Sequence, residues 1–187
     1  AKQRGIPVVM DPAGAGATPY RSSACAMLLK EIRPDIIRCN ASEVAALCDV
    51  RIKSRGVDTS MKSGDAAALA MQLAQKTKAV VSMSGEVDYI TDGHQVIKIH
   101  NGSPLMPKVT ALGCTATAIT GAMAAVQESR LRAAASAMAV MGVAGELAAA
   151  ISKGPGSLQP NFLDTLYCIG AEQLNSALII SHTSINE

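Results

Sequence analysis

The sequence predicts an α/β layered fold with a largely parallel sheet, on the basis of three observations. Short apolar runs of the kind that form strands buried on both faces occur at residues 6–10, 36–37 and 79–83. Segments with helical character follow or separate these runs, at residues 19–30, 40–48 and 64–76. Alternation of strands and helices along a chain is typical of sheets that are covered by helices.

The remaining elements follow from local signals. Asp92-Gly93 lies between two β-like runs and predicts a hairpin. Residues 51–63 are polar and predict a loop. Three helices are expected in the C-terminal half, at approximately residues 113–127, 131–152 and 158–174. We therefore predict one N-terminally incomplete domain over residues 1–174, and a tail at 175–187 that lacks clear helical periodicity.

Composition excludes several classes of protein. The chain has 187 residues and a net charge of only +2, which gives no electrostatic footprint for nucleic acid or for an anionic membrane. Gly145-Glu146 interrupts the longest apolar run, so we expect no transmembrane segment. The five cysteines are scattered and include no C-x-x-C pair, which argues against a disulfide framework or a zinc site. Reduced thiols indicate a cytoplasmic protein.

Polar side chains lie where three predicted strands end. Asp11 follows the first run, Arg38 the second and Ser84 the third. The carboxyl ends of parallel strands meet at one edge of a sheet, and ligands of such sheets bind at that edge. Small residues at 13–17 would let backbone amides approach a phosphate. Ordinary turn chemistry also accounts for the Asp-Pro-Gly cluster and for the turn after Ser84, so both interpretations stay open.

Asn40 and Glu43 have the spacing of a helix capping box, which requires no ligand. The Glu43 carboxylate could at the same time hold Mg²⁺ through water, near Asp11. Magnesium keeps several waters and usually takes one or two carboxylates plus substrate phosphates. Arg38 would face the same region and could bind phosphate oxygens through two parallel hydrogen bonds.

Gly113 and Cys114 carry the most informative local signal. The glycine stands just before a long Ala-rich helix that begins near Cys114. We expect the N–H groups of Gly113, Cys114 and Thr115 to lack partners in the helix and, with the helix dipole, to bind a phosphoryl group in transfer. Cys114 could accept the proton of a substrate hydroxyl. A single small cysteine is also common in cores, and this interpretation stays open.

Five segments resemble the hydroxyethylthiazole kinase family in order and spacing. They are VMDPAGAGATPYR (9–21), IRCNASE (37–43), SGEVDYITDG (84–93), PLMPKVTALGC (104–114) and GPGS (154–157). The resemblance covers about residues 5–170. It implies the ribokinase-like fold, a three-layer sandwich with helices on both faces of a central sheet. It also implies that roughly the first third of the usual family chain is absent.

The resemblance further implies a reaction. Members of the family transfer the γ-phosphate of ATP to the hydroxyl of 4-methyl-5-(2-hydroxyethyl)thiazole in thiamine salvage, with Mg²⁺, and are typically homotrimers. The implied roles are ATP contact for Arg38 and Ser84, proximity to Mg²⁺ for Asp11 and Glu43, substrate contact for Ala111, and the catalytic position for Cys114 beside Gly113. Phosphoryl transfer depends mainly on positioning and charge stabilisation, so a weak base can suffice.

One departure from the family pattern falls inside the site. The family commonly has Gly-Thr-Gly-Cys where this chain has Ala111-Leu112-Gly113-Cys114. A backbone contact made by glycine survives at Ala111 only if φ is negative there. Two alternative functions stay open: a ribokinase-like kinase for another small alcohol, and a degenerate non-catalytic paralogue or assembly subunit.

Overall fold

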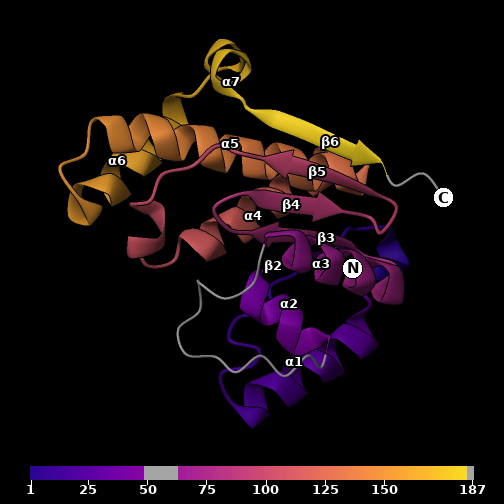
Figure 1. Cartoon of the computed structure of the whole chain (residues 1–187). Coiled ribbons are helices and arrows are strands. Elements are labelled where there is room, and N and C mark those ends of the chain that lie inside the picture. The colour runs from indigo at the N-terminus through magenta and orange to yellow at the C-terminus, as the bar shows by residue number, and fades with distance from the viewer. Residues whose placement is uncertain (49–62, 185–187) are drawn as a thin grey trace.

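The computed structural model describes residues 1–48 and 63–184, which form an α/β fold on one mixed sheet (Figure 1). The strands lie in the sheet in chain order. The first three are parallel: β1 (Val9–Met10), β2 (Ile36–Asn40) and β3 (Val80–Ser84). The other three are each antiparallel to the strand before: β4 (Asp88–Thr91), β5 (Gln95–Ile99) and β6 (Ile180–Ser184). The predicted α/β class is confirmed, but the described sheet is mixed rather than largely parallel, because three of its five strand pairs are antiparallel.

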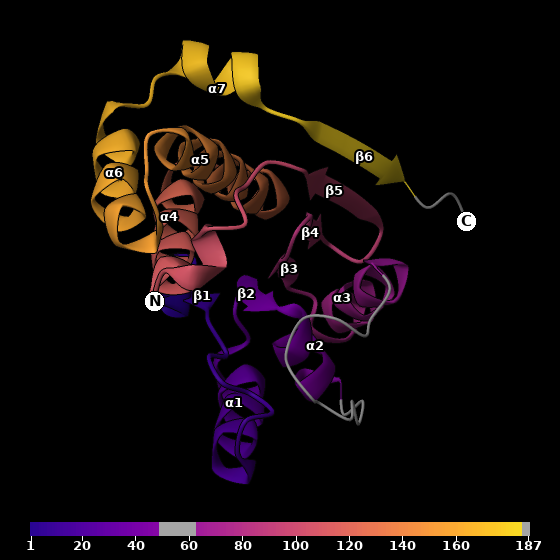
Figure 2. The same cartoon turned by 60° about the vertical axis from the view of Figure 1, so that its left-hand side comes forward.

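Helices cover both faces of the sheet and complete three layers (Figure 2). One layer contains α1 (Pro19–Ile32), α2 (Ala41–Leu47) and α3 (Ser63–Thr77). The other contains α4 (Leu112–Val126), α5 (Arg130–Ala150) and α6 (Pro155–Cys168). Ile36 and Ile37 are adjacent in β2 and fully buried, yet they belong to different core clusters. Successive strand side chains point to opposite faces, so each layer of helices has an apolar core of its own.

Helix α5 is the most deeply buried helix of the second layer. Its length and composition would suit a membrane span, but 67% of its most apolar window is buried inside the protein. Gly142 gives it a close contact with the loop after β5, since a Cβ there would lie 2.7 Å from the carbonyl oxygen of Asn101. The helix is therefore a core element, and its glycine sets how near that loop can approach.

The side chain of Asn101 fastens the C-terminal segment to this loop. Its Nδ2 donates to the Glu146 carboxylate and to the Ala177 carbonyl, each at 2.9 Å, and its Oδ1 accepts from the Ile179 N–H at 2.7 Å. Asn101 is buried, and Glu146 also accepts from the Gly102 N–H at 2.9 Å. One buried amide thus joins α5, the loop after β5 and the chain that enters β6.

The C-terminal half differs from the sequence expectation in two places. The single helix expected over 158–174 is two helices, α6 and α7 (Ala171–Ala177), which meet at Ile169 and Gly170. The expected tail contains β6, which pairs with β5. Two short 3₁₀ turns, η1 (Lys2–Arg4) and η2 (Met106–Lys108), are also present. The polar loop expected at 51–63 lies almost wholly outside the described residues, and the division into a domain of residues 1–174 and a tail stays a prediction.

Candidate active site

The parallel strands bring Asp11, Arg38 and Ser84 to one edge of the sheet, as their positions predicted. Asn40 at the end of β2 is the register partner of Ser84 at the end of β3, and β1 lies on the other side of β2. Asp11 directly follows β1. Side chains from three segments that are distant in sequence therefore lie together because their strands are neighbours.

Arg38 contacts both of the other side chains. Its Nη2 donates to Ser84 Oγ at 2.7 Å, and its Nη1 lies 3.7 Å from Asp11 Oδ2. The Arg38 side chain is only 11% exposed, and its buried Nε has no hydrogen-bond partner among the residues that the structure describes. Ser84 Oγ in turn donates to the Cys39 carbonyl at 3.3 Å. The guanidinium is therefore held in place while it retains donor capacity for a ligand.

Gly113 allows the start of α4 to lie directly against this guanidinium. A Cβ on Gly113 would lie 2.8 Å from Arg38 Nη1, which is closer than real side-chain contacts. The first hydrogen bond of the helix runs from the Thr115 N–H to the Ala111 carbonyl, at 3.0 Å. The expectation of a free Thr115 amide is therefore wrong, because α4 begins at Leu112 rather than near Cys114.

The N–H groups that precede this first bond are those of Leu112, Gly113 and Cys114. They have no partner within the helix, and the positive end of the helix dipole lies among them. Cys114 is exposed, so its thiol is accessible from solvent. The start of α4 thus combines backbone donors that lack a partner within the helix, a positive partial charge and an accessible thiol beside the Arg38 guanidinium.

Thr117 is a member of the site that the sequence analysis missed. Its Oγ1 donates to Asp11 Oδ2 at 2.6 Å and also lies 3.1 Å from the Gly113 carbonyl. It follows Gly113 by four residues and so lies on the same face of α4. A hydroxyl one helical turn after Gly113 is therefore the sequence signal from which Thr117 could have been predicted as a site residue. The bond ties α4 to the end of β1 and fixes one oxygen of the Asp11 carboxylate.

Glu43 forms the predicted capping box at the start of α2. Its Oε2 accepts from the Asn40 N–H at 2.9 Å, while Asn40 Oδ1 accepts from the Glu43 N–H at 3.0 Å. Its Oε1 accepts from the Gly14 N–H at 3.0 Å, so the small-residue loop after β1 is also held by this carboxylate. Glu43 is only 8% exposed. The buried Glu43 carboxylate therefore holds both the start of α2 and the small-residue loop after β1 in place.

The two carboxylates differ in how well they suit a magnesium ion. Among residues 1–48 and 63–184, no group of three or more His, Cys, Asp or Glu side chains could hold a metal ion. An ion bound mainly by phosphates needs only one or two carboxylates. Asp11 is 19% exposed and has a second oxygen outside its bond to Thr117, so it fits that need. Glu43, with both oxygens bonded to backbone N–H groups, fits only through water.

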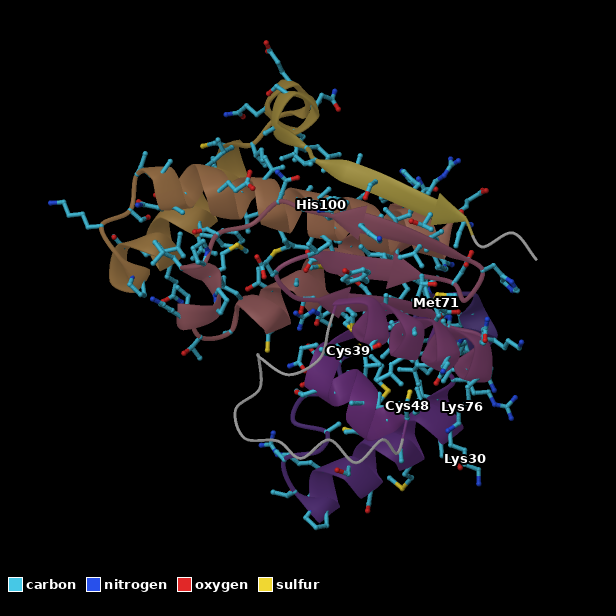
Figure 3. The ribbon with its side chains drawn as sticks, viewed as in Figure 1. Lys30, Cys39, Cys48, Met71, Lys76 and His100 are labelled. Atoms are coloured by element: carbon cyan, nitrogen blue, oxygen red, sulfur yellow. The ribbon has the colours of Figure 1, made fainter. Side chains whose placement is uncertain are left out.

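Cys39 lies in β2 beside the site but faces the core (Figure 3). It is fully buried in the cluster between the sheet and α1–α3. Burial raises the pKa of its thiol far above the usual range, with the nearby Glu43 charge acting in the same direction. Cys39 therefore packs as a small apolar side chain, and the accessible thiol of this region is that of Cys114.

A cavity of about 910 Å³ lies at the other end of the parallel strands. Residues that immediately precede β2 and β3 line it, including Asp35 and Lys78, together with α1 and α3. Lys30 near the end of α1 and Lys76 near the end of α3 also line it (Figure 3). Ligands of parallel sheets bind at the carboxyl ends of strands, so we place the site at Arg38 and not in this cavity.

Ala111 adopts a backbone conformation that alanine disfavours. Its φ is +70° and its ψ is 3°, the left-handed region, so the negative φ required for an unstrained alanine is not found. The cause is the sharp entry into α4, where the chain must turn out of the loop after η2. Glycine would adopt this conformation without a steric penalty.

Replacing Ala111 with glycine is therefore expected to stabilise the protein. The left-handed penalty of about 1–2 kcal/mol exceeds the entropic cost of glycine, for a net gain of about 1 kcal/mol in unfolding free energy. Urea unfolding of the full-length protein measures the gain. Ala118→Gly is the matched control, because Ala118 is exposed inside α4 and its replacement should cost about 1 kcal/mol. Equal losses for both variants would contradict the assignment of strain to Ala111.

Comparison with known sequences places the chain in one family. A profile of the hydroxyethylthiazole kinase family matches residues 1–172. The hydroxyethylthiazole kinase of Syntrophus aciditrophicus is 49% identical over 181 residues, which cover 96% of this chain and 67% of that protein. That of Moorella thermoacetica is 44% identical over 174 residues, or 93% and 65% of the two chains. The chain thus spans about two thirds of the length of these curated relatives.

Solved structures agree with this placement. The hydroxyethylthiazole kinase protein from Pyrococcus horikoshii OT3 superposes with a TM-score of 0.88 at 32% identity, over 98% of this chain and 68% of that one. The pyridoxal kinase of Staphylococcus aureus superposes with a TM-score of 0.62 at 19% identity, over 95% and 61%, which supports the predicted fold alone. The match over residues 1–172, the identity to the curated relatives and the shared fold lead to one conclusion: the chain belongs to the hydroxyethylthiazole kinase family.

Proposed function

We propose that this chain forms the phosphoryl-transfer part of a kinase that moves the γ-phosphate of ATP to the hydroxyl of 4-methyl-5-(2-hydroxyethyl)thiazole. The observation that carries the proposal is the contact between Arg38 and the start of α4, where Gly113 leaves room for the guanidinium. A fixed guanidinium beside unpaired backbone N–H groups is a site for a polyphosphate. The curated relatives named hydroxyethylthiazole kinase supply the identity of the alcohol.

Arg38 and Ser84 bind the phosphates of ATP in this proposal. The Ser84 hydroxyl, which accepts a hydrogen bond from the guanidinium at 2.7 Å, orients it. The N–H groups of Leu112, Gly113 and Cys114 then face the phosphoryl group as it transfers. Charge that develops on its oxygens is stabilised by donors that need no reorganisation.

The hydroxyl of the acceptor approaches from the exposed side of Cys114, whose sulfur in its deprotonated form accepts the hydroxyl proton and becomes a thiol as the oxygen bonds to phosphorus and ADP leaves. Ala111 contributes its backbone to the substrate side of the site. Asp11 and, through water, Glu43 are the residues that would hold Mg²⁺. When bound, that ion neutralises charge on the phosphates.

The activity is tested by ADP release from the full-length protein. The thiazole alcohol, pyridoxal and a reaction without acceptor are compared in the presence of Mg²⁺ and ATP. Turnover only with the thiazole alcohol is expected. Turnover only with another alcohol would favour the related kinase, and nucleotide binding without any turnover would favour the non-catalytic paralogue.

Replacing Cys114 with alanine tests the role of the thiol. We expect kcat to fall by roughly 10- to 100-fold, the low end for general-base catalysis, with KM for ATP within about twofold of the wild type. Cys168→Ala is the matched control, because Cys168 is also an exposed thiol, at the end of α6. An unaltered kcat in Cys114→Ala would remove the thiol from the mechanism and leave the backbone donors.

Two further properties are part of the proposal. We propose that the protein is cytoplasmic, as expected from scattered cysteines that include no C-x-x-C pair, and that the full-length protein is a homotrimer. Light scattering of the full-length protein measures its mass. A monomer would contradict this part of the proposal without affecting the assignment of the site.

A further inference from the structure

Asp88 is a buried acid that the site described above does not use. It begins β4, directly after the turn that follows Ser84, and it is only 6% exposed. Its Oδ1 accepts from the Gly85 N–H at 3.0 Å. Burial raises its pKa to about 7, while the Gly85 N–H and the positive charge of Arg38 both act to lower the pKa. The residue opposite it on β5 is the apolar Ile99.

Two routes lead from this carboxylate to the ATP-binding pair. Through the backbone, its hydrogen bond fixes the peptide between Ser84 and Gly85, and so fixes the residue whose Oγ accepts from Arg38. Through space, its negative charge acts on the Arg38 guanidinium. Arg38 is the charged group on β2 that acts on Asp88 among the described residues, and its own Nε is buried without a hydrogen-bond partner among them.

A turn-capping role alone does not account for an acid at this position. Aspartate often caps turns at the surface, where its charge stays solvated. Burying the charge is costly, and an asparagine would accept the same N–H hydrogen bond without that cost. Asp92 caps the next turn at lower cost, since it is only partly buried and accepts solvent-exposed hydrogen bonds from the N–H groups of His94 and Gln95. The negative charge of Asp88 therefore has a use of its own.

We propose that Asp88 is a positioning residue for the nucleotide: its carboxylate fixes the Ser84–Gly85 peptide and complements the charge of Arg38, so that the Arg38–Ser84 pair is held ready for the phosphates of ATP. The inference rests on the proposed function, because it assigns ATP to that pair. Asp88 does not touch the reacting atoms and acts through Arg38 and Ser84.

The test compares Asp88→Asn with Asp92→Asn in the full-length protein. Asparagine keeps the acceptor for the Gly85 N–H and removes the charge. We expect KM for ATP and Kd for ADP to rise roughly tenfold in Asp88→Asn, the effect of losing one interaction with a charged group, with kcat within about twofold. Asp92→Asn, which removes the charge of a turn-capping acid elsewhere, should leave both constants unchanged. If the Asp88→Asn protein does not fold, Asp88→Ser takes its place, because serine is also neutral and is smaller.

The pH profile separates this role from a purely structural one. The wild type should bind ADP more tightly as pH rises through about 7 and Asp88 ionises, and Asp88→Asn should lose that part of the profile. Titration of the nucleotide is common to both proteins and cancels in the comparison. Equal ADP affinity of wild type and variant at every pH would overturn the inference. Failure of the wild type to bind ADP would instead overturn the proposed function, so the two failures are distinguishable.

The same carboxyl predicts a pH dependence of stability. The pKa of Asp88 is about 7 in the folded protein, above the value of about 4 for an exposed aspartate, so the folded state binds more protons than the unfolded state between these values. The free energy of unfolding should therefore fall as pH rises from about 4 to about 7, and Asp88→Asn removes this loss. Urea unfolding should show the stability of the variant rising relative to that of the wild type from about pH 4 to about pH 7 and then levelling off. A constant difference would contradict the raised pKa.

Discussion

Replacing Arg38 with alanine is expected to lower kcat/KM for ATP by roughly 10²- to 10³-fold, the range for removing a donor that stabilises developing charge. The guanidinium contacts Ser84, lies 3.7 Å from Asp11 and occupies the space that Gly113 leaves open. Its loss removes a hydrogen-bond donor to the phosphates of ATP. It also frees the side chains of Ser84 and Asp11, which the guanidinium contacts. ADP release by the full-length protein at varied ATP concentration measures the effect.

Two further variants make this result specific. Arg38→Lys keeps the charge but cannot bond to Ser84 and to a phosphate in the same plane, so we expect it to recover only part of the lost activity. Arg132→Ala is the matched control, since Arg132 is an exposed arginine of α5. Wild-type kinetics in Arg38→Ala, with the fold intact by circular dichroism, would show that the ATP phosphates bind elsewhere.

Replacing Asn101 with leucine is expected to have the largest effect on stability. The leucine fills a similar volume but leaves the Ala177 carbonyl, the Ile179 N–H and one Glu146 bond without their partner. The three bonds are only partly buried, so losing each should cost about 0.5–1.5 kcal/mol, and we expect a loss of about 2–4 kcal/mol in unfolding free energy. Urea unfolding of the full-length protein measures it.

Asn175→Leu is the control for this prediction, because Asn175 lies in α7 close to the same segment but is exposed. We expect its effect to stay within about 0.5 kcal/mol of zero. A similar small effect for Asn101→Leu would mean that the loop after β5 and the entry into β6 are held by other contacts.

The positions of Asp11, Arg38 and Ser84 could be predicted because one rule governs all three. Each is at or just past the end of an apolar run, and parallel strands bring such ends to one edge. The capping box of Asn40 and Glu43 was equally local, since its spacing alone defines it. Sequence reasoning succeeded where the signal lay within a few residues of the group concerned.

It failed where a distant contact decides the structure. The φ of Ala111 is set by the direction in which the chain enters α4, which no neighbouring residue encodes. The bond from Thr117 to Asp11 joins residues more than a hundred positions apart. Ile180 and its neighbours form β6 because β5 offers an edge and Asn101 directs the chain to it, while the segment itself has no strong strand pattern.

The order of the strands in the sheet has a consequence for how the protein assembles. Each described strand pairs with the one made just before it, so during synthesis the sheet can grow from one side without inserting a strand between two others. β6 is synthesised long after its partner β5, because α4–α7 lie between them in the chain. Until it docks, β5 presents Val96, Ile97 and Ile99 along an open edge. An uncovered apolar edge can pair with another chain, so the docking of β6 protects the nascent protein from aggregation.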